Sequence, residues 1–123
     1  MVSLIRFSFK ENAIDSISEK IRHFYDLYYL MKSPECIKFV ASSSFKEKFE
    51  TILNHDREIF DEPIGWQNKL IIESPLVNDF SNIWIQIKDK YQTELSAFAY
   101  RPIPDEKVVA KCFEDLIKRI QIN

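Results

Sequence analysis

Glycine is almost absent from this sequence of 123 residues, in which Gly65 is the only one. A Walker A loop, a dinucleotide-binding G-x-G-x-x-G turn and a G-x-S-x-G elbow all require glycine where the backbone approaches phosphate or turns sharply. None of these motifs is present. The sequence therefore excludes the usual nucleotide-cradling loops, and with them the nucleotide-binding half of most transferases.

Long apolar runs and cysteine motifs are missing as well. No run approaches the roughly 18 apolar residues of a membrane-spanning helix, and the first residues lack the pattern of a secretory signal. We therefore expect a cytoplasmic protein without a membrane segment. The two cysteines, Cys36 and Cys112, form no C-x-x-C pair. This spacing predicts two reduced, packed thiols rather than a disulfide or a zinc site.

Neither sign of charge is in large excess. The 17 basic and 19 acidic residues give a formal net charge of -2, so the chain lacks the basic signature of a general nucleic-acid binder. Hydrophobic residues make up 46% of the chain and charged residues 29%, which is typical of a globular protein. Because this length suits one core, we predict that residues 1–123 form a single domain.

Four segments carry apolar residues at spacings of three and four, the pattern of an amphipathic helix. The first covers residues 14–31 and stops before Ser33-Pro34, because the residue before proline disfavours the helical conformation. A short helix over residues 34–40 precedes the second long helix, which begins at Ser43 or Ser44 and ends near residue 60. Its predicted buried stripe consists of Phe45, Phe49, Ile52, Leu53, Ile59 and Phe60.

The third long helix is predicted from residue 80 to 91, and the fourth begins at Asp105 and has a wide apolar face that includes Val108 and Cys112. Between the second and third helices, Pro63, Gly65 and Pro75 predict a long irregular connection over residues 61–77. We expect this connection to pack on the core through Ile64, Trp66, Leu70 and Ile71.

The first nine residues are ambiguous. Val2, Leu4, Phe7 and Phe9 alternate imperfectly with polar residues in the manner of a strand, although Ile5 interrupts the alternation and no partner strand is evident. Taken together, the patterns predict an all-α fold: a single compact domain of about four main helices, with the long irregular connection between the second and the third.

The segment KIRHFYDLYYLM, residues 20–31, holds the candidate chemistry. Arg22 and Asp26 are one helical turn apart, so their side chains are neighbours on one face. One interpretation is a surface pair that contributes a few tenths of a kcal/mol. Another is functional, because a carboxylate flanked by aromatic rings can accept a proton, or bind a metal together with further carboxylates or a phosphate.

Aromatic residues supply a possible interface. Tyr29 falls in register with Arg22 and Asp26 on the first long helix, and Phe98 and Tyr100 lie in a segment that is predicted to be a loop. Aromatic side chains exposed in a loop are typical of a contact surface. We therefore predict that Tyr29, Phe98 and Tyr100 belong to such a surface.

The segment KIRHFYDLYYL resembles the R-H-x-Y-D-L-Y segment in the C-terminal half of the AbiEii-type nucleotidyltransferase toxins. The later stretch IWIQIKDKYQTELSAF, with IPDEKVVAKCFEDLIKRI after it, is similar to the closing helical pair of that family. The resemblance runs from about Leu4 to Ile122. It implies a part of a toxin from a toxin–antitoxin or phage-defence system.

The resemblance assigns Asp26 to an aspartate near the active site of the family, a possible base, and Arg22 to the arginine that precedes it. It also implies that residues 2–8 are the end of a helix. A complete enzyme of this family has an N-terminal core with a Gly-Ser turn and a D-x-D pair for a nucleoside triphosphate and Mg²⁺. This sequence has neither feature. Because phosphoryl transfer depends on positioning the triphosphate and neutralising its charge, we expect the isolated chain to be inactive.

Three functions stay open at the level of sequence. In the first, the chain completes a nucleotidyltransferase site for a missing N-terminal core and contacts an antitoxin or an acceptor RNA. In the second, it is a non-catalytic helical module for protein interaction. In the third, it is a helical nucleic-acid binder, whose affinity would fall steeply with salt.

Overall fold

The computed structural model describes residues 1–98 and 103–121. Within these ranges every regular element is a helix, which confirms the predicted all-α class. The elements are α1 Val2–Phe7, α2 Ala13–Ser18, α3 Ile21–Leu30, α4 Pro34–Ala41, α5 Ser44–Ile59, the 3-10 turns η1 Trp66–Asn68 and η2 Ile71–Glu73, α6 Pro75–Asn78, α7 Phe80–Phe98 and α8 Glu106–Gln121.

The core is built around a cluster of aromatic rings between α3, α7 and α8. The Phe24 ring lies 5.0 Å from the Phe113 ring and 5.3 Å from the Trp84 ring, measured between centroids, and Phe80 completes the group at 4.9 Å from Phe113. These side chains are all buried. Since ring pairs at such distances add stability beyond the area they bury, this cluster fixes how the three helices pack.

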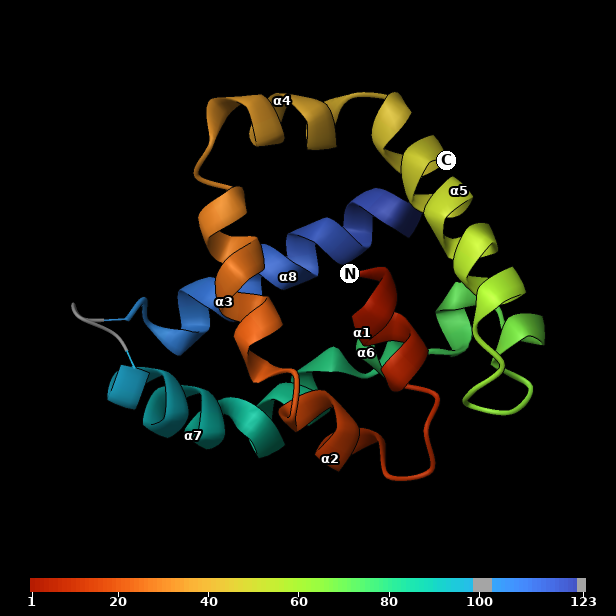
Figure 1. Cartoon of the computed structure of the whole chain (residues 1–123). Coiled ribbons are helices and arrows are strands. Elements are labelled where there is room, and N and C mark those ends of the chain that lie inside the picture. Colours follow the sequence, from red (N-terminus) through yellow and green to blue (C-terminus); the bar gives the residue numbers. More distant parts are fainter. Residues whose placement is uncertain (99–102, 122–123) are drawn as a thin grey trace.

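The α4 helix takes an unusual position at the edge of the fold. It links the end of α3 to the start of α5 and lies across the top of the molecule in Figure 1, with α8 running below it. Its main contacts are with α5 and α8. None of its side chains is buried, so α4 is held by its two ends and by partial contacts rather than by the core.

The N-terminal segment is helical, and its strand-like alternation is misleading. Leu4 and Ile5 are adjacent and both at most 1% exposed, which one face of a strand cannot achieve because successive side chains point to opposite sides. Ser8, just after α1, is also buried and is bonded to Ser74 before α6. The helical conformation agrees with what the family resemblance implies for residues 2–8.

The two buried serines form a chain of hydrogen bonds. The Leu76 N–H donates to Ser74 Oγ at 3.2 Å, the two hydroxyls are 2.6 Å apart, and Ser8 Oγ donates to the Ile5 carbonyl at 2.5 Å. Because the Ser8 proton is engaged by Ile5, the proton between the hydroxyls belongs to Ser74. This arrangement satisfies both buried side chains and joins the end of α1 to α6.

The predicted helix over residues 14–31 is wrong in one respect, because it is broken between Ser18 and Ile21 into α2 and α3. The Ser18 hydroxyl donates to the Asp15 carbonyl at 2.9 Å, a local bond that competes with helix continuation. The break turns α2 toward α1 and α7, while α3 packs on α7 and α8. Ile17 and Ile21 are both buried on either side of the break.

The apolar stripe that was predicted for the second long helix is too wide. On α5 only Phe49 and Leu53 are buried, because α5 meets the rest of the fold along one narrow face. Ile52 and Ile59 are more than half exposed, and Phe60 is 38% exposed with the Arg6 guanidinium 3.8 Å from its ring centroid.

In the connection, Trp66 is buried as predicted, but Ile64 is 94% exposed and Leu70 is exposed as well. The connection reaches the core through the Trp66 indole, whose N–H donates to the Phe60 carbonyl at 2.8 Å. Gly65 just before it has a φ of 84°, the left-handed region that the other residue types rarely adopt. The single glycine is thus located where the backbone needs it.

Candidate functional site

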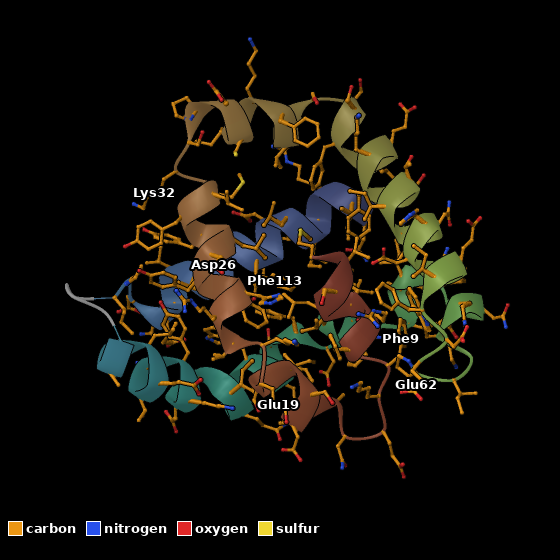
Figure 2. The ribbon with its side chains drawn as sticks, in the orientation of Figure 1. Phe9, Glu19, Asp26, Lys32, Glu62 and Phe113 are labelled. Carbon is orange, nitrogen blue, oxygen red and sulfur yellow. The ribbon has the colours of Figure 1, made fainter. Side chains whose placement is uncertain are left out.

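Arg22 and Asp26 both lie on the solvent-exposed side of α3. In the described part of the chain neither side chain takes part in an ion pair, so the predicted neighbours do not meet as a salt bridge. Figure 2 shows Asp26 on the middle of this helix. No group of three His, Cys, Asp or Glu side chains among the described residues could hold a metal ion.

Tyr29 belongs to a cluster of tyrosine rings at the C-terminal half of α3. Its ring centroid lies 4.8 Å from that of Tyr25 and 5.5 Å from that of Tyr28. Tyr29 is half-buried, so a partner would reach only part of its surface. Phe98 is the last residue of α7, so its predicted position in a loop is wrong; its side chain and Tyr100 lie outside the described residues.

A groove with a volume of about 830 Å³ lies between α3, α4 and α8. We call it the α4–α8 groove. Figure 2 shows Lys32 at its outer corner, where α3 passes into α4. The groove is lined by Tyr28, Met31, Lys32, Ile37, Val40, Ala41, Val108, Lys111, Cys112, Asp115, Leu116, Lys118 and Arg119.

The groove exists because two helices present apolar side chains that nothing in the described chain covers. Ile37 on α4 is 48% exposed and Val108 on α8 is 47% exposed, yet both line the groove. The sequence pattern assigned Val108 to a buried face, and its exposure corrects that expectation. An apolar surface that stays open to water costs free energy unless a partner covers it.

The rim of the groove is basic. Its charged side chains are Lys32, Lys111, Lys118, Arg119 and a single carboxylate, Asp115. Four cations and one carboxylate give the lining a net charge of +3, whereas the whole chain has a net charge of -2. The lining of the groove is therefore more basic than the chain as a whole.

Two of the basic groups have partners. Lys111 Nζ lies 3.2 Å from Asp115 Oδ1, one turn along α8. Lys32 Nζ lies 4.8 Å from the centroid of the Tyr28 ring, and the neighbouring Tyr28 hydroxyl raises the pKa of the Lys32 ammonium. Lys118 and Arg119 make no ion pair within residues 1–98 and 103–121. Their charges are therefore available to a ligand.

Cys112 lies between the apolar and the charged parts of the groove. Burial raises the pKa of its thiol, and the nearby Asp115 carboxylate raises it further. Since the thiolate is the nucleophilic form, these surroundings slow the reactions of the Cys112 thiol, which serves mainly as an apolar wall group. Both cysteines are free thiols, as predicted.

The sequence contains a pattern that indicates this groove, although the spacing of apolar residues alone did not reveal it. Lys111, Lys118 and Arg119 are spaced along the same helix as Val108 and Cys112, so basic and apolar residues alternate along one side of α8. The apolar face of α8 is too wide for the helices that pack on it. Because the neighbouring helices cover only part of this face, Val108 lies in the groove and not in the core.

The described helices include none that is long and apolar enough to cross a membrane. Comparisons of the chain with protein-family models, with curated proteins and with solved structures find no match.

Proposed function

We propose that this chain is a non-catalytic helical module for protein interaction, and that the α4–α8 groove is its binding surface. The observation that carries the proposal is the state of α4, which has no buried side chain although it forms one wall of an 830 Å³ apolar groove. Such a wall leaves apolar surface exposed to water, which costs free energy. A bound partner segment would cover this surface and remove the cost.

The groove has the anatomy of a recognition site. Ile37, Val40 and Val108 provide an apolar centre, and the lysines and Arg119 surround it with polar groups that keep the unbound surface soluble. Protein interfaces combine an apolar core with a polar rim in the same way. The residues proposed for catalysis, Arg22 and Asp26, are not among those that line the groove.

Site-specific photocrosslinking in the native host tests the proposal. A photoreactive amino acid is placed at Ile37 or at Val108, and as a matched control at Ile52, which is 52% exposed on α5 and outside the groove. We expect a discrete crosslinked species from both groove positions and none from position 52. Crosslinking of equal yield at all three positions, or at none, would contradict the proposal.

A second proposal follows the family resemblance: the chain completes a nucleotidyltransferase site for a separate N-terminal core, and the groove contacts an antitoxin. The helical conformation of α1 supports it, because the resemblance implied a helix where periodicity suggested a strand. Arg22 and Asp26 are exposed on α3 and thus accessible to another polypeptide. The nucleoside triphosphate and Mg²⁺ would enter with that core, and RNA is the proposed acceptor.

Label transfer distinguishes this second proposal. The chain is incubated with labelled nucleoside triphosphates, Mg²⁺ and tRNA, with and without an N-terminal core of the family. We expect label transfer only in the presence of the core. Transfer should decrease when the Asp26→Ala variant is used in place of the parent chain. Transfer by the chain alone, or transfer that is indifferent to Asp26, would refute this role.

A further inference from the structure

We infer that the occupant of the α4–α8 groove is an acidic amphipathic helix of a partner protein. This inference rests on the proposed interaction function and adds the chemical class of the partner. It is drawn from three features of the groove: the length of its lining, the arrangement of its apolar side chains and the charge of its rim.

The length of the groove suits a helix of about three turns. On α8 the lining extends from Val108 to Arg119, and eleven helical steps of 1.5 Å correspond to about 16 Å. A partner helix of about eleven residues covers the same length, whereas an extended strand would do so with about five residues. A helix thus offers more side chains to the same groove.

The apolar lining forms two rows at helical spacing. Val108, Cys112 and Leu116 follow one another at four-residue intervals along α8, and Ile37 faces them from α4 with Val40 and Ala41 one turn farther on. Rows of this kind are the ridges against which another helix packs, and partner helices in such grooves insert side chains at i, i+3, i+4 and i+7. The lining therefore favours a third helix between α4 and α8.

The rim determines the charge of that helix. Lys111 and Lys118 are seven residues apart, or two turns of α8, and Arg119 follows Lys118, while Lys32 stands at the α3 end of the groove. Cations near the C-terminus of α8 also interact favourably with the helix dipole. This effect alone could explain the presence of Lys118 and Arg119. It does not account for Lys32, which lies at the far end of the groove, whereas Lys111 is already paired with Asp115 on α8. A partner with carboxylates beside its apolar stripe complements Lys32, Lys118 and Arg119, none of which forms an ion pair with another described residue.

A further hollow extends the basic surface. It has a volume of about 330 Å³ and shares Val40, Ala41 and Arg119 with the groove, and it continues to Phe45 and Lys46 on α5. Arg119 therefore lies between two adjoining hollows. A helix longer than three turns would pass this arginine and keep both apolar and cationic contacts.

Two designed peptides test the inference on the full chain. Each has 14 residues with leucine at i, i+3, i+4 and i+7, and the flanking positions carry glutamate in one peptide and lysine in the other. Binding is measured by fluorescence anisotropy at low salt. We expect the glutamate peptide to bind more tightly, and the difference to shrink as the salt concentration rises.

Charge reversal in the chain supplies the specificity control. In the variant Lys118→Glu/Arg119→Glu we expect the glutamate peptide to bind about 2- to 30-fold more weakly, from two exposed ion pairs, and the lysine peptide to bind more tightly. The matched variant Lys48→Glu/Lys69→Glu places the same charge change on exposed residues outside the groove and should leave the ranking unchanged. An equal effect of both variants would overturn the inference.

Protection of Cys112 locates the bound peptide. In a Cys36→Ser background we expect the glutamate peptide to slow alkylation of Cys112 by maleimide. If both peptides bind and protect equally, the groove binds helices but the acidic specificity is wrong. If neither peptide binds or protects, the interaction function and the inference both fail. If dodecanoate protects Cys112 and neither peptide does, the occupant is a small amphiphile and the inference is overturned.

Discussion

Removal of the Glu106 carboxylate should destabilise the fold more than any other substitution of an acidic residue on α8. The Trp84 indole N–H of α7 donates to Glu106 Oε2 at 2.5 Å, and the Glu106 residue is only 8% exposed. Glu106 is also the first residue of α8, where the helix dipole favours a negative charge. In Glu106→Ala the indole N–H is left buried without an acceptor.

The magnitude follows from these contacts. A hydrogen bond to a charged group contributes about 1.5–3 kcal/mol, and the loss of the favourable dipole adds about 0.3–1 kcal/mol. We therefore expect Glu106→Ala to lower the free energy of unfolding by about 2–4 kcal/mol, a large fraction of the roughly 5–15 kcal/mol of a typical domain. Glu106→Gln retains an acceptor for the indole and should cost about 0.5–1.5 kcal/mol.

Urea denaturation followed by far-UV circular dichroism measures both variants, with m-values compared to verify that the denatured state is unchanged. Glu114→Ala is the matched control, because Glu114 lies on the same helix and no hydrogen bond or ion pair joins it to a described residue. It should stay within about 0.5 kcal/mol of the parent chain. If the alanine and glutamine variants at position 106 are equally stable, the indole–carboxylate bond is not what stabilises this junction.

Three further predictions concern single side chains. Tyr91→Phe should cost about 1 kcal/mol in urea denaturation, because the buried Tyr91 hydroxyl donates to the Pro104 carbonyl at 2.9 Å; a neutral result would refute this. Burial lowers the pKa of His23 below its ordinary value of 6.5. The unfolded chain therefore binds the proton more tightly, and stability should fall as the pH drops through 6.5, less so in His23→Asn; parallel pH profiles would contradict this. Gly65→Ala should lower the thermal midpoint at a cost of about 1–2 kcal/mol, because the φ of 84° suits glycine although open space surrounds it; an unchanged midpoint would show that the turn relaxes.

Much of the fold could be predicted from the sequence. Helical periodicity correctly identifies the buried side chains wherever one whole face of a helix packs on the core. Trp84 and Tyr91 are two helical turns apart within the predicted third long helix, and both are buried on α7. The all-α class follows from the same pattern. The break between α2 and α3 was not predictable in this way, because Ile17 and Ile21 keep the four-residue spacing across it.

The groove could not be predicted from the sequence, because it is formed by apolar residues that no other described segment covers. Helical periodicity assigns an apolar residue such as Val108 to the core. Only the position of α4 in the structure shows that no described segment covers it. The roles of Arg22 and Asp26 stay predictions of the resemblance. Their exposure on α3 is compatible with a surface pair and with a contact to a second polypeptide.

The Ser8–Ser74 bond has a topological consequence. It joins residues that are 66 positions apart and so closes a loop of the chain that contains α2 to α5. The α4 wall of the groove lies inside this loop, and both ends of the loop are anchored in the core. Because α4 buries no side chain, it belongs to the part of the fold that opens at the lowest free energy. We therefore expect α4 to open before the aromatic cluster and the Ser8–Ser74 bond.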